Sequence, residues 1–232
     1  MATQSTIVLV HGFWGGAAHW SKVIVQLSRI GYASIRAVEN PLTSLADDAE
    51  RTRKMVAQVD GPVLLVGHSY GGAVITVAGA APNVVGLVYV AAFAPDGGES
   101  LSDIMNAAPA PAGAANVAPD SNGYVWINQS KFGESFCQDL PADEQLVMAV
   151  TQKAPLGSTF GNKTVAPAWR TKPSWYQISS EDRMIHPDNQ RRMSARLAAR
   201  RVITLAAGHA SLASRPAEVS ALIDEAAKAT AS

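Results

Sequence analysis

The pentapeptide Gly67-His68-Ser69-Tyr70-Gly71 is the segment of this chain whose residue types and spacing best suit covalent chemistry. A serine hydroxyl becomes a nucleophile when a base removes its proton and when the backbone projects it out of the fold. A sharp turn between a strand and a helix achieves this projection, and it leaves no room for side chains two positions before and after the serine. The two glycines meet that requirement. We therefore predict that Ser69 is a nucleophile, with a structural glycine-rich turn as the alternative.

The loop His11-Gly12-Phe13-Trp14-Gly15-Gly16 is a second segment suited to acyl transfer. Negative charge develops on a carbonyl oxygen in such reactions, and backbone NH groups stabilise it well because they need no reorganisation. We predict the NH groups of Phe13 and Tyr70 as the two donors, the second at the start of a helix whose dipole adds to the effect. Gly12 lets the backbone approach closely. A plain connection between a strand and a helix is the alternative interpretation.

His209 and Asp182 are the predicted base and acid that complete a triad with Ser69. Where a serine turn of this kind begins a triad, the acid and then the histidine follow it along the chain. His209 comes directly after the last predicted strand, at the carboxyl edge of the sheet, whereas His186 precedes a helix and is predicted to lie at the surface. Asp182 follows the penultimate strand and can orient the imidazole. The alternatives for the acid are Glu181 and Asp96.

The elements around these residues predict an α/β fold with a mostly parallel, doubly wound sheet of six strands. Short apolar runs rich in β-branched residues alternate with longer segments of helical period. The predicted strands are 6–10, 33–38, 63–66, 84–92, 174–179 and 202–205. The predicted helices are 18–30, 44–59, 72–80, 187–200 and 216–229, the second of them capped by Ser44.

The alternation of strands and helices fails after residue 94. The stretch that follows contains Ala107-Ala108-Pro109-Ala110-Pro111-Ala112-Gly113 and no clear strand, although 140–150 predicts a short helix. Long excursions in a compact domain are usually lids or binding loops. We predict one domain over 1–232, with a core of 1–94 and 167–232 and an insertion of about 95–166 between the fourth and fifth strands.

Composition narrows the classes of partner and cofactor. The 232 residues carry 19 Lys and Arg against 19 Asp and Glu, so no overall field attracts nucleic acid, an anionic membrane or a strongly charged substrate. Cys137 is the single cysteine and has no companion for a disulfide or a metal cluster. The N-terminal residues lack a secretory signal, and no apolar stretch reaches the length of a membrane span. We expect a cytoplasmic protein that acts on a small molecule without a cofactor or metal.

These residues together resemble the α/β-hydrolase superfamily, and more narrowly the plant methylesterase and hydroxynitrile lyase family with its bacterial esterase relatives. The resemblance is carried by Val8-Leu9-Val10-His11-Gly12, Gly67-His68-Ser69-Tyr70-Gly71-Gly72, Val90-Ala91-Ala92-Phe93, Phe136-Cys137-Gln138-Asp139-Leu140-Pro141-Ala142-Asp143, Asp182-Arg183-Met184-Ile185-His186-Pro187 and Gly208-His209. It implies that 95–166 is a helical cap over Ser69 whose aromatic residues shape the substrate pocket. Trp126 is the candidate contact from the cap, and Gly12 and Trp14 are candidates from the first loop. Relatives are often dimers, which leaves a homodimer open.

The resemblance separates two chemistries at two positions. Lyases of that family carry a threonine after the first-loop histidine and a lysine after the triad histidine, whereas this chain has Gly12 and Ala210. Without the lysine no cation stabilises departing cyanide, and Gly12 leaves the space that an ester's tetrahedral intermediate needs. The sequence therefore predicts a carboxylesterase that cleaves small apolar or aromatic esters through an acyl-enzyme intermediate. A non-hydrolytic enzyme of the lyase kind and an inactive ligand-binding receptor on the same fold are the alternatives.

Overall fold

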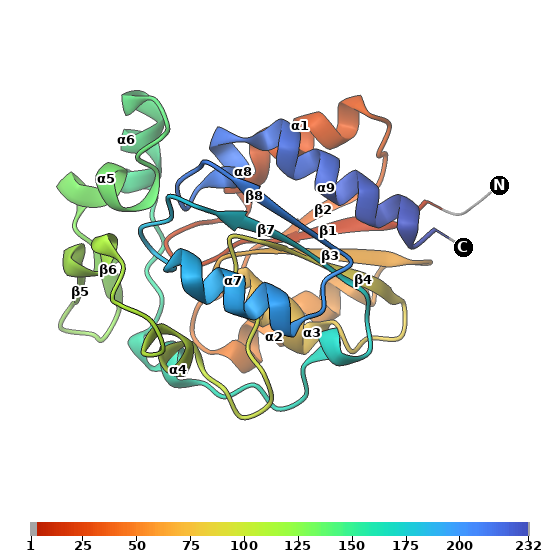
Figure 1. The fold of residues 1–232 in the computed structure, drawn as a ribbon, viewed down its shortest axis with the longest axis horizontal. Coiled ribbons are helices and arrows are strands. Elements are labelled where there is room, and N and C mark those ends of the chain that lie inside the picture. The colour runs from red at the N-terminus through yellow and green to blue at the C-terminus, as the bar shows by residue number, and fades with distance from the viewer. Residues whose placement is uncertain (1–3, 232) are drawn as a thin grey trace.

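The computed structural model describes residues 4–231, and a sheet of six strands with helices on both faces lies at its centre (Figure 1). The strands of this sheet are β1 (Thr6–Val10), β2 (Ile35–Val38), β3 (Val63–His68), β4 (Val84–Val90), β7 (Ser174–Ser179) and β8 (Arg201–Leu205). They lie in the order β2-β1-β3-β4-β7-β8, and every pairing is parallel. The predicted α/β-hydrolase architecture is confirmed, with a sheet that is entirely rather than mostly parallel. Residues 1–3, part of the segment used to predict location, lie outside the described residues.

The central strands are almost wholly apolar because helices cover both faces of the sheet. Every residue of β1 and β3 is buried. The register places Val10 at the end of β1 beside Gly67 of β3, and His68 beside Val90 of β4. The carboxyl ends of these three strands therefore meet at one edge of the sheet, and the loops that leave them are brought together there.

The helices form two layers (Figure 1). One face of the sheet carries α1 (Ser21–Arg29), α8 (Ser211–Ser214) and α9 (Pro216–Ala229), with the 3₁₀ turn η1 (Ala17–Trp20) before them; the other carries α2 (Leu45–Val56), α3 (Tyr70–Ala78) and α7 (Pro187–Arg196). Ser44 caps α2 as predicted, accepting from the Asp47 NH at 3.0 Å. α7 ends earlier than predicted because Ala198 takes a left-handed conformation, with φ of +46°. Within residues 4–231 no helix is long and apolar enough to cross a membrane.

The chain between β4 and β7 lies beside the carboxyl edge of the sheet (Figure 1). It contains α4 (Leu101–Met105), α5 (Phe132–Phe136), α6 (Ala142–Val150), the strands β5 (Val117–Pro119) and β6 (Val125–Ile127), and the 3₁₀ turns η2 (Ala112–Asn116), η3 (Gln129–Lys131), η4 (Gly157–Gly161) and η5 (Ala168–Arg170). The antiparallel pair β5 and β6 corrects the expectation that this stretch holds no strand. Each strand is three residues long, too short for an alternating pattern to mark it.

Candidate active site

Ser69 occupies the turn between β3 and α3 in a strained backbone conformation. Its φ of +54° and ψ of −126° lie in a region that residues with side chains rarely adopt, so the surrounding packing must hold it. The glycines make the turn possible. A Cβ on Gly67 would lie 2.5 Å from the Gly71 carbonyl oxygen, and a Cβ on Gly71 would lie 2.2 Å from the Val10 carbonyl oxygen. The spacing that singled out the pentapeptide is therefore a steric requirement of this turn.

The structure brings Ser69, His209 and Asp182 into one chain of contacts. The Ser69 Oγ lies 2.8 Å from His209 Nε2, and His209 Nδ1 lies 2.8 Å from Asp182 Oδ2. All three residues are buried. With the carboxylate accepting from Nδ1–H, Nε2 is the nitrogen free to take the serine proton. This arrangement can activate a serine hydroxyl for attack on a carbonyl carbon.

The Asp182 carboxylate is held in place by three further donors. Its Oδ1 accepts from the backbone NH groups of Met184 at 2.7 Å and Ile185 at 2.9 Å, and its Oδ2 accepts from the Gln190 side-chain amide at 2.7 Å. These bonds fix the carboxylate with one oxygen toward His209. Sequence reasoning missed Gln190, whose only signal is a polar residue on the face of α7 that packs against the sheet.

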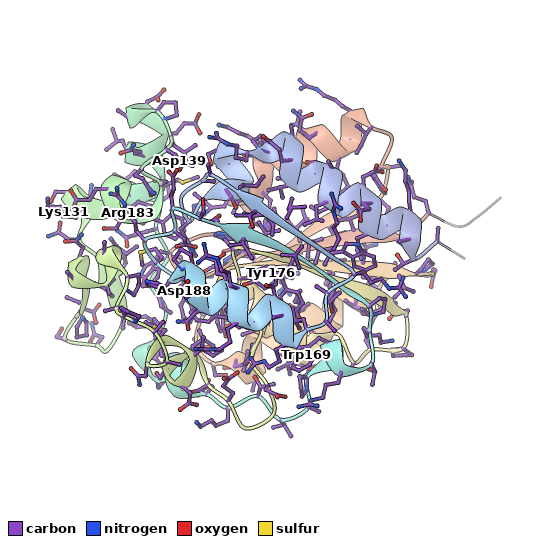
Figure 2. All side chains as sticks on the ribbon, in the orientation of Figure 1. Lys131, Asp139, Trp169, Tyr176, Arg183 and Asp188 are labelled. Atoms are coloured by element: carbon purple, nitrogen blue, oxygen red, sulfur yellow. The ribbon has the colours of Figure 1, made fainter. Side chains whose placement is uncertain are left out.

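The alternative acids and base take no part in the contacts that join Ser69, His209 and Asp182. Glu181 is exposed, and the Asp96 carboxylate pairs with the Arg170 guanidinium at 2.6 Å. His186 lies at the start of α7 and accepts from the backbone NH of Asp188, which is labelled in Figure 2. Within residues 4–231, no three histidine, cysteine, aspartate or glutamate residues are grouped so as to hold a metal ion.

The loop that carries His209 is fixed from two sides. His68 lies beneath it, and its Nε2 donates to the His209 carbonyl oxygen at 2.8 Å. Burial lowers the pKa of His68 well below its usual value, so the ring stays neutral in this packing role. On the other side, the Phe136 ring meets the His209 ring edge-on at 4.9 Å, and Asp139 Oδ2 accepts from the Gly208 NH at 2.9 Å. Figure 2 shows Asp139 where the α5 and α6 segment approaches this part of the chain.

The first loop places a second wall beside Ser69. A Cβ on Gly12 would lie 2.5 Å from the Ser69 Cβ and 3.0 Å from its Oγ, so only glycine fits there. Among residues 4–231, no protein acceptor takes the NH of Phe13 or of Tyr70. Tyr70 is the first residue of α3, where the helix dipole is positive. With no acceptor in the described residues, these two NH groups can donate to a ligand, and their role as oxyanion donors stays a prediction.

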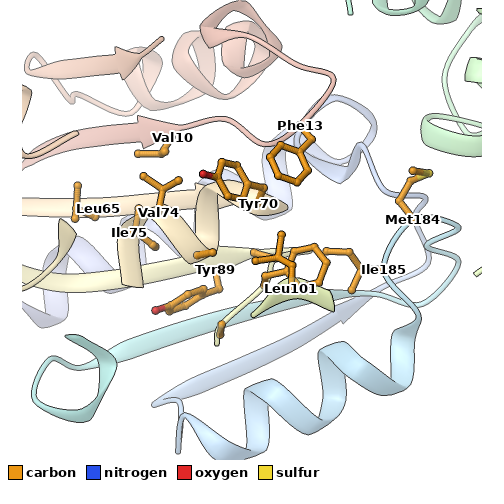
Figure 3. Packing of buried hydrophobic residues seen from close by; sticks show 14 of the residues in the cluster. Val10, Phe13, Leu65, Tyr70, Val74, Ile75, Tyr89, Leu101, Met184 and Ile185 are labelled. Carbon is orange, nitrogen blue, oxygen red and sulfur yellow. The ribbon is translucent and has the colours of Figure 1, made fainter. Parts of the chain in front are cut away.

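A cavity of about 180 Å³ opens at Ser69. Its lining is apolar apart from the Ser69 hydroxyl, and it includes the rings of Phe13, Trp14, Phe93 and Phe160 and the thioether of Met184. Figure 3 shows the Phe13 ring and the Met184 and Ile185 side chains in this part of the molecule. The Trp14 indole NH is satisfied by the Val125 carbonyl oxygen at 2.8 Å. A ligand that enters must therefore present apolar surface.

Trp126 does not reach this cavity, contrary to the predicted substrate contact. It is 40% exposed on β6, and its indole NH donates to Asp120 Oδ2 at 3.0 Å. Met105 and Phe160, from the same long segment, line the cavity instead. The sequence could not select them, because Met105 ends a five-residue helix and Phe160 lies in a 3₁₀ turn, and elements this short show no period that tells which way a side chain faces.

Three features define the class of α/β hydrolases. They are the parallel sheet, the strained serine turn that follows β3, and the chain order Ser69, Asp182, His209. The sequence model of the alpha/beta hydrolase family matches residues 7–222, and the chain belongs to this family.

Individual relatives agree with this assignment. A probable hydrolase R7 of a Phoma species is 24% identical over 204 residues, which cover 81% of this chain and 82% of that protein. The structure of a pyrethroid hydrolase from Sphingobium faniae aligns over 98% of both chains, with a TM-score of 0.81 and 22% identity. That of polyneuridine aldehyde esterase aligns over 96% of this chain and 99% of its own, with a TM-score of 0.82 and 19% identity. The family match confirms the predicted resemblance to α/β hydrolases, and the two solved structures share the fold of this chain.

Proposed function

We propose that this protein is a serine hydrolase that cleaves small apolar or aromatic carboxylic esters through an acyl-enzyme intermediate. The observation that carries the proposal is the pair of 2.8 Å contacts that join Ser69 to His209 and His209 to Asp182, at the mouth of an apolar cavity. The structural similarity to a pyrethroid hydrolase and to polyneuridine aldehyde esterase supports the choice of ester hydrolysis.

Each group in the site has one role in the proposed reaction. Ser69 Oγ attacks the ester carbonyl carbon while His209 Nε2 takes its proton, and Asp182 stabilises the imidazolium that forms. The NH groups of Phe13 and Tyr70 donate to the oxyanion. His209 then returns the proton to the departing alcohol. Water attacks the acyl enzyme by the same route and releases the acid.

A panel of p-nitrophenyl esters of increasing acyl length tests the proposal. Hydrolysis well above the rate of the Ser69→Ala variant is expected for the shorter acyl chains, which an apolar cavity of about 180 Å³ can hold. Absence of hydrolysis across the panel would overturn the proposal. Mandelonitrile tests the lyase alternative. The buried Ala210 stands where the lyases carry a lysine, so no cation stabilises departing cyanide there, and we expect no cyanide release.

The Phe160→Ala substitution is expected to shift the acyl preference toward longer chains. The ring centroids of Phe160 and Phe13 lie 4.7 Å apart at the cavity wall. Removal of the Phe160 ring therefore opens space for about two further methylenes. The ratio of kcat/KM for octanoate to that for acetate should rise about tenfold, since each buried CH₂ is worth about 0.8 kcal/mol. Trp126→Ala, which removes an aromatic ring outside the cavity, is the matched control and should leave the ratio unchanged. An unchanged ratio in Phe160→Ala would show that the acyl group binds elsewhere.

The Gly12→Ala substitution is expected to lower kcat/KM for these esters by about 10²-fold, because the new Cβ displaces the serine turn or the first loop. Gly16→Ala in the same loop is the control, since its Cβ would meet the Glu39 carboxylate at an ordinary 3.4 Å. Steady-state kinetics on both variants provide the comparison. Wild-type activity in Gly12→Ala would contradict the close approach of the loop to Ser69.

Three features of the protein stay predictions from its sequence. They are the division into a core and a cap of about 95–166, the cytoplasmic location and the homodimer that the family resemblance leaves open. We propose in addition that the substrate is a free small molecule rather than a nucleic acid or a membrane component, because the 19 basic and 19 acidic residues balance.

A further inference from the structure

Asp48 on α2 is a fully buried carboxyl group that the proposed reaction does not use. Its Oδ1 accepts from the Leu42 backbone NH at 2.8 Å, and its Oδ2 accepts from the Tyr70 hydroxyl at 2.6 Å. Burial raises the pKa of this carboxyl above its usual value. Burying an acidic group lowers the stability of a folded protein, so we ask what Asp48 contributes to function.

Tyr70 connects Asp48 to both proposed oxyanion donors. One donor is the backbone NH of Tyr70 itself, and the other is that of Phe13. The two rings stack, with centroids 4.0 Å apart and planes 16° apart, and Figure 3 shows them side by side. Both residues are almost completely buried. The side chains of the two donor residues therefore form one rigid unit, and the hydroxyl at its inner end is bonded to Asp48.

The Oδ1 oxygen of Asp48 fixes the loop that precedes α2. Leu42 holds a left-handed backbone conformation, with φ of +64°, while its NH donates to Asp48. Its carbonyl oxygen accepts from the Leu156 NH at 2.9 Å. Leu156 precedes η4, which carries the cavity residue Phe160. One buried carboxyl thus ties the oxyanion donors to the wall of the cavity.

We propose that the hydrogen bond between Asp48 and the Tyr70 hydroxyl positions the two oxyanion donors, which makes Asp48 and this hydroxyl positioning groups for the transition state. The inference rests on the proposed ester hydrolysis. The oxyanion exists in the transition state and not in the bound ester, so misplaced donors should lower kcat and leave KM unchanged. A purely structural role would lower stability without this separation.

The Tyr70→Phe substitution tests the inference because it removes the hydroxyl and keeps the ring that stacks on Phe13. We expect kcat to fall about tenfold, a part of the 10²- to 10³-fold that complete loss of one donor costs, with KM within about twofold of wild type. The affinity for a trifluoromethyl ketone, whose adduct with Ser69 places an oxyanion at the donors, should fall by a similar factor.

Tyr89→Phe is the matched control. Tyr89 is also fully buried, and its hydroxyl is bonded at 2.9 Å to the hydroxyl of Thr76, which lies near the end of α3 opposite to Tyr70. It should lose comparable stability and keep its kcat. Asp48→Asn provides a second variant of nearly unchanged size, in case Tyr70→Phe does not fold, and should also lower kcat while sparing KM.

The outcomes separate this inference from the proposed function. An inactive wild type would overturn both. An active wild type whose Tyr70→Phe and Asp48→Asn variants keep wild-type kcat and inhibitor affinity would overturn the inference alone. Equal losses of kcat in Tyr70→Phe and Tyr89→Phe would also overturn it, because the effect would then follow from any lost buried hydroxyl bond.

Discussion

The Ser69→Ala variant is expected to lose about 10⁴- to 10⁶-fold in kcat for ester hydrolysis, because no other group can form the covalent intermediate. The hydroxyl lies 2.8 Å from His209 Nε2, so its loss removes the nucleophile and leaves the rest of the site in place. The residual rate should come from the Phe13 and Tyr70 donors and from substrate binding. Steady-state kinetics with the best ester of the panel, together with thermal unfolding, provide the measurement.

Ser220→Ala is a suitable control for this variant. Ser220 is buried on α9, on the face of the sheet opposite α2 and α3, so its change tests the effect of a lost buried hydroxyl far from the site. It should keep wild-type kcat. A Ser69→Ala protein that folds and keeps more than a small fraction of the activity would mean that hydrolysis does not pass through Ser69.

The second large effect is expected at Asp182, where substitution by asparagine should lower kcat by about 10⁴-fold. The surroundings determine which way the new amide points. The NH groups of Met184 and Ile185 require an acceptor, so the amide oxygen should stay with them and the NH₂ should turn toward His209. Nδ1 then has to accept, and Nε2 carries the proton. In that tautomer Nε2 cannot take the proton of Ser69.

Asp96→Asn provides the comparison for this prediction. Asp96 lies after β4, and its carboxylate pairs with the exposed Arg170 guanidinium rather than with a group of the site. We expect less than a twofold change in kcat, in line with the small contribution of surface ion pairs. If Asp96→Asn lowers kcat strongly while Asp182→Asn does not, the acid has been assigned to the wrong strand.

The residues of the candidate triad could be predicted because a parallel sheet converts chain order into position. The apolar runs mark the strands, and the carboxyl ends of parallel strands meet at one edge. Residues 69, 182 and 209 each follow such a run, so their side chains gather although 140 positions separate Ser69 from His209. The glycines around Ser69 added a local requirement that few residues could meet.

The contacts that refine the site could not be predicted in this way. Gln190 reaches Asp182 from the buried face of a helix, and Asp48 reaches Tyr70 from another helix, through side-chain directions that no repeat in the sequence encodes. The cavity residues Met105 and Phe160 lie in a five-residue helix and a 3₁₀ turn, which are too short for a repeat to show which way their side chains face. Trp126 was selected as an aromatic residue of the predicted cap, and in the structure it faces Asp120 and solvent.

Labelling with a fluorophosphonate, followed by intact-mass measurement and peptide mapping, tests the central claim most directly. The reagent reacts with a serine that a neighbouring base activates, and it needs no knowledge of the substrate. The account predicts one adduct per chain, located on Ser69 and absent from the Ser69→Ala variant. A wild-type protein that stays unlabelled, or equal labelling of wild type and Ser69→Ala, would contradict it.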